Sequence, residues 1–293
     1  MAIDLYKRSI IVVIGVPLVL FLLTFGVLNH LPFFLLILAV VLVSSLEYQN
    51  MLKQRWITDY KLLFLITAGI LCLGFWIQTF APASGLKDVL LVAGLIAFIV
   101  PQFFKNSFLE SLAYMGHYLF GLVFITYGMS HLVLVINMAN GLYYIFLMLA
   151  AVWLSDSAAY VAGILVLGEK RHRIPLKVSP NKSWEGYAAG LVGAVAGVFL
   201  ANLIFGHTAS VNLGYSTIEF SGKIFGWWQS VLVGLFISIF AGAGDLAESV
   251  LKRSVNIKDS GTLLPGHGGI MDRVDSFFLL APAFYYLLKF CAG

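Results

Sequence analysis

The sequence contains little charge and almost no cysteine. Only 11% of its 293 residues are Asp, Glu, Lys or Arg, whereas about 25% is usual for a soluble domain. Hydrophobic residues make up 60% of the chain and the mean hydropathy is +0.94, which excludes a water-soluble globular protein. We therefore predict a polytopic integral membrane protein, because lipid has to cover much of its surface.

The scarcity of cysteine excludes a second group of structures. Cys72 and Cys291 are too few for a disulfide framework or a four-ligand zinc site. The formal net charge of +4 is carried by short basic groups that form no continuous stripe, so no nucleic-acid partner is expected. The first apolar run follows Lys7 and Arg8 as in a signal peptide, but it is long enough to span a bilayer and has no small-residue cleavage site. We interpret it as a retained first helix.

Nine charge-poor runs are candidates for membrane-spanning helices. They cover residues 9–28, 31–46, 62–80, 89–104, 118–136, 142–167, 187–205, 224–244 and 276–290. A helix rises about 1.5 Å per residue and the hydrocarbon layer is about 30 Å thick, so the second, fourth and ninth runs are marginal. The runs are continuous rather than alternating, which disfavours a membrane β-barrel. The sequence predicts an all-α fold with about nine transmembrane helices.

Lysine and arginine are unequally divided between the connections. Three lie on one side, namely Lys87, Lys223 and Lys289. The other fifteen are Lys7, Arg8, Lys53, Arg55, Lys61, Lys105, Lys170, Arg171, Arg173, Lys177, Lys182, Lys252, Arg253, Lys258 and Arg273. Because positive charge is retained on the cytoplasmic side during insertion, the N-terminus is predicted to be cytosolic and the C-terminus outside. The polar connections 168–186 and 245–275 then share the cytosolic face.

Acidic residues are distributed unevenly along the chain. Through Met148 they lie in connections or at the edges of runs, whereas the later part places Asp156 within a run and gathers most of the other carboxylates near two run ends. No repeat, low-complexity stretch or linker is visible. We therefore predict one continuous membrane domain, with residues 1–150 as a scaffold of helices and residues 151–293 carrying a cytosol-facing site.

Asp156 lies in the middle of an apolar run, where a carboxylate costs about 2.5–3.5 kcal/mol on insertion scales. Trp153, Asp156 and Tyr160 are spaced to share one helix face and so to line one polar cavity. A simple hydrogen bond between helices is the alternative for Asp156. Further along, Ser179 and Pro180 are typical of a helix N-cap and first helical position.

Lys182 would then lie in the first turn of that helix, where the helix dipole favours anions. A bound phosphate would relieve this conflict, and a merely solvated lysine is the alternative. Asp245, Glu248 and Lys252 share one helix face, and Asp272 and Asp275 share another just before the last run. Such clustered carboxylates are hard oxygen ligands suited to Mg²⁺.

The segment 265–269, Pro-Gly-His-Gly-Gly, joins these two groups of carboxylates. Its glycines allow a tight turn that brings backbone N–H groups near an anion, although a purely structural turn is the alternative. It lacks the Walker spacing of a P-loop. His267 alone cannot form a zinc site, and a hydrogen bond to phosphate or to the loop backbone suits it better.

These residues resemble the signature of the phosphatidate cytidylyltransferases, or CDP-diacylglycerol synthases, of bacterial type. The signature occupies 27 positions in register, with Ser249, Lys252, Arg253, Lys258, Asp259, Pro265, His267, Gly268, Gly269, Asp272, Arg273 and Asp275. The Trp-x-x-Asp-Ser segment 153–157 and the Ser-Pro-x-Lys-Ser-x-Glu-Gly segment 179–186 are also similar to that family. Residues 1–150 match only as a hydrophobic scaffold.

The resemblance implies transfer of a cytidylyl group from CTP to phosphatidic acid, with Mg²⁺ and a second cation as candidate cofactors. It implies a bacterial inner-membrane enzyme whose active site faces the cytosol. The catalytic residues would be Asp156, Lys182, Glu185, Asp245, Glu248 and Asp272. Substrate would be bound by Ser179, Ser183, Lys252, Arg253, Lys258, Asp259, His267, Gly268, Gly269 and Arg273. Metal would be held by some of Asp245, Asp272 and Asp275.

Three other functions fit the sequence less well. A cation-coupled carrier would account for Asp156 but not for a basic loop on one face, and the chain shows no duplicated half. A CDP-alcohol phosphotransferase would need an Asp-Gly-x-x-Ala-Arg motif, which is absent. A purely structural protein leaves the charged cluster without a role. The sequence leaves open the acyl-chain preference, the basis of cytosine selectivity, the number of metal ions and whether a homodimer forms.

Overall fold

The computed structural model describes residues 17–53, 60–104, 108, 110–166, 172–205, 209–212, 217–220, 225–263 and 268–292. The chain packs as two compact units. Unit 1 comprises Met1–Asn137 and Ser254–Gly293, and unit 2 comprises Met138–Arg253. The two units meet in the sequence near residues 137 and 254. The predicted division at residue 150 is a different one, because it separates a scaffold from the part that carries the site, and it stays a prediction.

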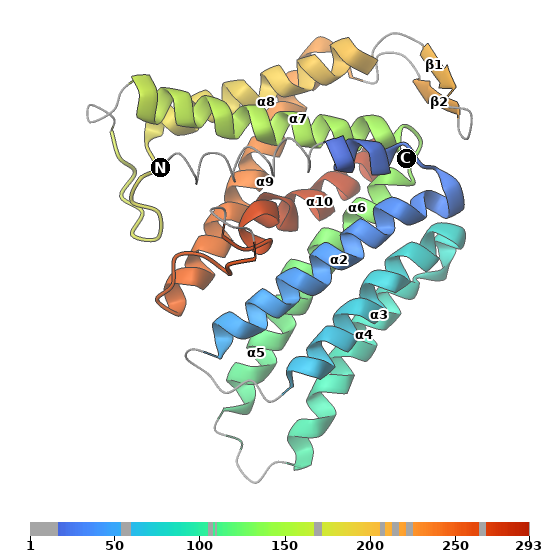
Figure 1. The fold of residues 1–293 in the computed structure, drawn as a ribbon, viewed down its shortest axis with the longest axis vertical. Helices are drawn as coiled ribbons and strands as arrows, with labels where there is room; N and C mark the ends of the chain where they lie inside the picture. The colour runs from blue at the N-terminus through green and yellow to red at the C-terminus, as the bar shows by residue number, and fades with distance from the viewer. Residues whose placement is uncertain are drawn as a thin grey trace. The chain divides into compact units, whose positions relative to one another are not determined.

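Eight helices in the described part of the chain are long and apolar enough to cross a membrane. In unit 1 they are α2 (Val27–Leu52), α3 (Lys61–Phe80), α4 (Leu86–Ile99) with the 3₁₀ turn η2 (Val100–Phe104), α5 (Ser111–Gly121) joined through the π-helical turn η3 (Leu122–Tyr127) to α6 (Gly128–Ile136), and α10 (Met271–Ala292). In unit 2 they are α7 (Gly141–Tyr160) with the π-helical turn η4 (Val161–Val166), α8 (Trp184–Phe205) and α9 (Trp227–Ser254). A short 3₁₀ turn, η1 (Pro82–Ser84), links α3 to α4 (Figure 1).

The all-α fold class is therefore confirmed, and each of the eight helices overlaps one of the predicted runs from 31–46 onward. The marginal runs become longer helices than their apolar cores indicated. Residues 17–28 of the first predicted run, 9–28, are described: 17–23 are helical, and Val27 and Leu28 already belong to α2. Residues 9–16 of this run lie outside the described part of the chain. The predicted positions of the two termini relative to the membrane stay predictions.

Three helices extend beyond their apolar runs by turns that carry predicted site residues: α8 begins at Trp184 and so includes Glu185, and α9 and α10 are longer in the same way. α9 continues past residue 244 to Ser254, so Asp245, Glu248 and Lys252 lie on one continuous helix. α10 begins at Met271, which places Asp272 in its first turn. Apolar content alone underestimates the length of these helices. Polar side chains interrupt the hydrophobic pattern before the helical hydrogen bonding ends.

In unit 1, α10 packs against α6, while α2 packs against α3 and α6. A Cβ atom at Gly128 of α6 would lie 3.1 Å from the carbonyl carbon of Phe278, so glycine permits close approach of the α6 and α10 backbones. Phe278 and Phe284 of α10 are completely buried, as are Phe64 and Phe75 of α3. This packing fixes α10, and the acidic residues at its start, against helices from the first half of the chain.

In unit 2, α7 and α8 lie side by side over most of their length (Figure 1). A Cβ at Gly193 of α8 would lie 2.8 Å from the Cβ of Ala158, and one at Gly197 would lie 2.5 Å from the Cα of Ala151. Small residues allow such close packing in lipid, where dispersion rather than hydrophobic burial drives helix association. The arrangement holds α7, which carries Asp156, in a defined position.

One element of unit 2 departs from the all-helical pattern. Between α8 and α9, β1 (Ala209–Asn212) pairs antiparallel with β2 (Thr217–Phe220), with Ala209 opposite Phe220 and Asn212 opposite Thr217. A two-stranded hairpin inside a short connection leaves no long periodic pattern, which is why sequence reasoning did not predict it.

Candidate active site

The exposed face of α7 carries the polar segment identified in the sequence. Trp153, Asp156 and Tyr160 all lie on α7 and are all exposed, while the polar cavity that they would line stays a prediction. Asp156 lies close enough to Asp245 to be repelled by its negative charge, and close enough to Lys182 to be attracted by its positive charge. Three of the residues predicted to be catalytic are therefore brought together within unit 2.

Lys182 and Asp245 form an ion pair that joins the α7–α8 connection to α9. The Lys182 Nζ lies 2.6 Å from the Asp245 Oδ2, and the two side chains are 30% and 37% exposed. An ammonium group has three donors, so this pair occupies only part of the hydrogen-bonding capacity of Lys182. The pair is accessible to a ligand and carries both signs of charge.

The start of α8 corrects the predicted helix boundary. α8 begins at Trp184, and the Ser183 Oγ accepts a hydrogen bond from the Gly186 N–H at 3.1 Å, as an N-cap side chain does. Ser183 rather than Ser179 is therefore the cap. Lys182 precedes the cap, so the expectation that it opposes the helix dipole from within the first turn is wrong.

The connection before α8 closes on itself through backbone hydrogen bonds. The Trp184 N–H donates to the His172 carbonyl at 3.0 Å, and the Ile174 N–H donates to the Lys182 carbonyl at 2.9 Å. Glu185 reinforces this closure, because its carboxylate accepts hydrogen bonds from the backbone N–H and the Nδ1 of His172. In this structure Glu185 holds the connection together, and its catalytic role stays a prediction.

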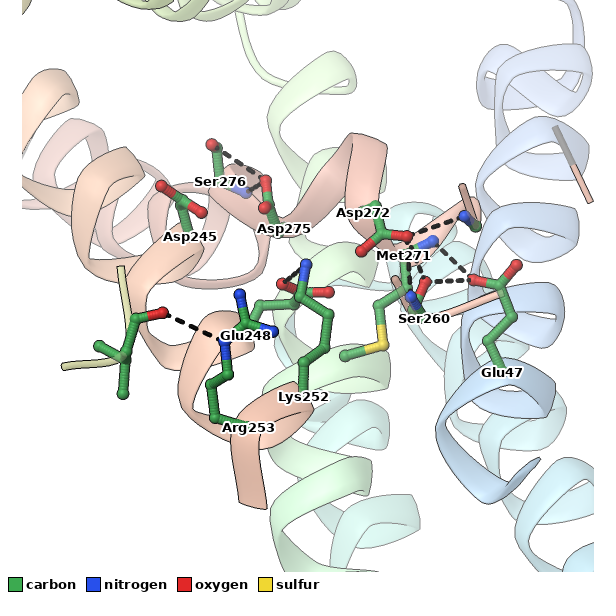
Figure 2. A network of polar contacts seen from close by, with 12 residues as sticks. Glu47, Asp245, Glu248, Lys252, Arg253, Ser260, Met271, Asp272, Asp275 and Ser276 are labelled. Carbon is green, nitrogen blue, oxygen red and sulfur yellow. Dashed lines mark hydrogen bonds and ion pairs between the residues drawn. The ribbon is translucent and has the colours of Figure 1, made fainter. Parts of the chain in front are cut away.

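Three predicted site residues lie near the end of α9. The Lys252 Nζ lies 2.5 Å from the Glu248 Oε2, and Glu248 is completely buried (Figure 2). The Arg253 Nε donates to the Val178 carbonyl at 3.4 Å, which ties α9 to the α7–α8 connection. The geometry indicates that Glu248 orients Lys252, whereas Arg253 is exposed at the surface of the unit.

Asp272 of unit 1 accepts several hydrogen bonds through a single carboxylate oxygen. Its Oδ2 accepts the backbone N–H groups of Ser260 at 2.9 Å and of Gly269 at 2.8 Å. The Ser260 hydroxyl also lies 2.9 Å from this oxygen. Asp272 therefore connects the first turn of α10 to two points of the preceding loop.

Glu47 of α2 belongs to the same group of contacts, although sequence reasoning assigned it to the scaffold. Its Oε1 accepts the Ile270 N–H at 3.0 Å, and its Oε2 accepts the Met271 N–H at 2.8 Å. The Ser260 hydroxyl lies 3.1 Å from Oε2, and Figure 2 shows Glu47 directed at Ser260 and Met271. The one signal in the sequence was a carboxylate at the end of an apolar run.

The glycines of the predicted phosphate loop pack against these two carboxylates. Gly268 has a positive φ of 85°, and a Cβ there would lie 2.7 Å from the Asp272 Oδ2. At Gly269 a Cβ would overlap the Glu47 carboxylate and the Ser260 hydroxyl, while at Gly261 it would lie 2.7 Å from the Glu47 Oε1. Close packing against the Glu47, Ser260 and Asp272 side chains is thus sufficient to require glycine at these positions. Contact of these glycines with a substrate stays a prediction.

The remaining predicted residues make mostly local or surface contacts. The Asp275 Oδ1 accepts the Ser276 N–H at 2.6 Å. Lys258, Asp259 and Arg273 are exposed, and Ser179 is half-buried. His267 lies outside the described residues.

Comparison with known proteins identifies the family to which these residues belong. Residues 6–291 match the cytidylyltransferase family. The chain belongs to the cytidylyltransferase family. It is 34% identical over 289 residues to the phosphatidate cytidylyltransferase of Bacillus subtilis (strain 168), covering 98% of each chain. Shorter matches, each about half of both chains, join it to the phosphatidate cytidylyltransferases of Staphylococcus haemolyticus (strain JCSC1435), 39% identical over 150 residues, and Staphylococcus aureus (strain COL), 38% identical over 150 residues.

Asp245, Asp272 and Asp275 are the carboxylates predicted to bind Mg²⁺. Within the described ranges, no three His, Cys, Asp or Glu side chains are grouped closely enough to hold a metal by themselves. Mg²⁺ does not require such a cage, because it is usually held by one or two carboxylates with water and substrate phosphates. Asp245, Asp272 and Asp275 supply the hard oxygen atoms that fit this mode. The Asp272 Oδ2 already receives hydrogen bonds from the loop.

Proposed function

We propose that this protein transfers the cytidylyl group of CTP to phosphatidic acid, forming CDP-diacylglycerol and pyrophosphate. The observation that carries the proposal is the similarity to the Bacillus subtilis phosphatidate cytidylyltransferase over nearly the whole of both chains. The accessible Lys182–Asp245 pair of unit 2 and, separately, the exposed Lys258 and Arg273 of unit 1 support it, because this chemistry handles several phosphate groups at once.

The reaction needs no covalent nucleophile from the protein. A phosphate oxygen of phosphatidic acid forms a bond to the α-phosphorus of CTP, while the bond from that phosphorus to the bridging oxygen of the β-phosphate breaks. The electron pair leaves with pyrophosphate. Because the attacking group is already an anion, catalysis consists mainly of alignment and of stabilising the negative charge.

The cations of unit 2 are suited to this task. Lys182 is already oriented by Asp245 and retains N–H donors for a phosphate, and Lys252 is oriented by Glu248. Arg253 is exposed on the same helix as Lys252. A positively charged side chain held by a carboxylate loses little conformational freedom on binding a phosphate, which favours productive alignment. In unit 1, Lys258 and Arg273 are exposed cations for the same purpose.

Mg²⁺, with a second cation, would be held through some of Asp245, Asp272 and Asp275, whose carboxylate oxygens are the ligands that it prefers. Bound there, Mg²⁺ supplies neutralisation of phosphate charge and draws the nucleotide towards carboxylates that would otherwise repel it. The excess of Lys and Arg in the connections around these residues supports an active site on the cytosolic face of the membrane. The similarity to bacterial enzymes supports a bacterial inner membrane as that membrane.

The direct test is to incubate the purified protein in detergent with CTP, phosphatidic acid and Mg²⁺ and to identify the lipid product by mass spectrometry. We expect CDP-diacylglycerol, and we expect EDTA to abolish its formation. Absence of this product, with an active control enzyme in the same detergent, would contradict the proposed function. Undiminished product in EDTA would contradict only the role of the metal.

A further inference from the structure

Glu47 connects the first half of the chain to the loop that precedes α10. It lies near the end of α2 and is 7% exposed, yet no residue within ten positions of it belongs to the family signature. Its hydrogen-bond partners are Ser260, Ile270 and Met271, all more than 200 residues away along the chain. A buried carboxylate with such partners is costly unless its hydrogen bonds are fully made, and here the donors converge on both of its oxygens.

The contacts of Glu47 form one network with those of Asp272. We define the anchor cluster as Glu47, Ser260 and Asp272. The Ser260 hydroxyl is 3.1 Å from the Glu47 Oε2 and 2.9 Å from the Asp272 Oδ2, so its single proton can be donated to one carboxylate at a time. The backbone N–H groups at residues 260, 269, 270 and 271 supply the other donors. Both ends of the loop are thereby held to the same pair of carboxylates.

The glycines provide a second, independent indication that the loop is built around Glu47. A Cβ at Gly261 would lie 2.7 Å from the Glu47 Oε1, and a Cβ at Gly269 would overlap the same carboxylate. Real Cβ atoms do not tolerate such separations. The backbone on both sides of the loop therefore approaches Glu47 as closely as glycine allows.

Met271 begins α10, and its N–H is one of those that a helix leaves without an internal partner. The Glu47 carboxylate accepts this N–H, and its negative charge is favourable at a helix N-terminus. Glu47 thus fixes the start of the helix that carries Asp272 and Arg273. Through Ser260 it also fixes the backbone two residues after Lys258.

We propose that Glu47 is a positioning residue for the reaction, which acts by holding the loop around Ser260 and the first turn of α10 in their productive places. This inference rests on the proposed function, because Lys258, Asp272 and Arg273 are assigned there to the substrates and the metal. Glu47 itself needs no contact with substrate.

The test compares Glu47→Gln with the wild-type protein and with Ser44→Ala, a matched control one turn earlier on α2. The Ser44 side chain is completely buried and has no hydrogen-bond partner among the described residues. In Glu47→Gln an amide N–H₂ group replaces one acceptor oxygen and faces donors that it cannot satisfy. We expect kcat to fall about 10- to 100-fold at temperatures well below unfolding, as for small misplacements of catalytic groups, while Ser44→Ala keeps its activity.

Hydrogen–deuterium exchange provides a readout that does not depend on turnover. Glu47→Gln should speed exchange of the amides at 260 and 269–271, which the anchor cluster protects, without speeding exchange in α8. The proposal is overturned if exchange there is unchanged, if exchange speeds up but kcat does not fall, or if the unfolded fraction accounts for the whole loss of activity. If the wild-type protein forms no CDP-diacylglycerol, the proposed function fails, while the exchange experiment still tests the anchoring.

Ser260→Ala is a milder second variant, and by itself it should speed exchange of the amides at 269–271 and lower kcat. A folded Ser260→Ala protein that shows neither change would contradict the proposal. The substitution removes the hydroxyl shared by the two carboxylates but leaves the backbone hydrogen bonds to Ile270 and Met271. We expect kcat to fall less in Ser260→Ala than in Glu47→Gln. In the double variant, the fold-decrease in kcat should be smaller than the product of the two single fold-decreases. Fully multiplicative effects would show that Glu47 and Ser260 act separately and would contradict the proposal.

Discussion

At the scale of single residues, Lys182 is the cation whose role can be tested most cleanly. It is paired with Asp245 and partly exposed, whereas Lys177 lies on the same connection and is exposed. Lys182→Met keeps the length of the side chain but removes its charge. We expect kcat/KM for CTP to fall by about 100-fold, as for removal of one donor to a developing charge.

Lys177→Met is the control for that measurement and should leave kcat/KM nearly unchanged. Steady-state kinetics with both variants, at saturating phosphatidic acid, separates a specific contact from a general loss of positive charge near the membrane. Equal losses in the two variants, or a normal rate in Lys182→Met, would show that Lys182 does not contact the phosphates.

The sequence indicated many of these residues but not their partners. Asp156 could be identified because a carboxylate within an apolar run is rare and costly. Lys182 was indicated by its place near a predicted helix start, and Asp245 by its helical spacing with Glu248 and Lys252. Glu47 could not, because its partners Ser260, Ile270 and Met271 are brought to it only by the fold. A carboxylate at the end of an apolar run is equally typical of a solvated helix end.

At the scale of helices, run length predicted where eight helices lie but not where each one begins or ends. The Ser179-Pro180 dipeptide has the composition of a helix start, yet the backbone pairing between His172 and Trp184 keeps that segment out of the helix until Ser183. Local sequence preference is outweighed by hydrogen bonds that close a loop. The ends of α9 and α10 differ from the apolar runs for a related reason, since polar side chains are tolerated where helices leave the hydrocarbon.

The α7–α8 contact gives a prediction at this scale. Gly193→Ala would place a Cβ 2.8 Å from that of Ala158, so the two backbones must separate. We expect a loss of about 1–3 kcal/mol, the usual cost of overpacking, seen as a lower thermal midpoint in detergent. Gly116→Ala on α5 is the control, because nothing lies within 4 Å of its Cβ position.

In Gly116→Ala the added methyl group favours the helix by about 0.5–1 kcal/mol relative to glycine, so its midpoint should stay the same or rise. A Gly193→Ala protein as stable as the wild type would mean that α7 and α8 are not in the close contact described for unit 2.

At the scale of the whole molecule, orientation in the membrane rests on the unequal distribution of Lys and Arg. It can be tested with single cysteines after Cys72 and Cys291, both free thiols, have been replaced. We expect a membrane-impermeant thiol reagent to label Ser84→Cys in intact cells and to label Lys177→Cys only after permeabilisation. The reverse pattern would invert the topology and place the candidate site outside the cell.

The central claim is that this cytidylyltransferase uses phosphatidic acid as the acceptor. The most direct measurement follows radiolabel from CTP labelled either at the α-phosphate or at the γ-phosphate into lipid extracted after reaction with phosphatidic acid. We predict that the α-label enters the lipid as CDP-diacylglycerol and that the γ-label stays in the aqueous phase as pyrophosphate. Label from the γ-phosphate in the lipid, or no label from either nucleotide, would contradict the account.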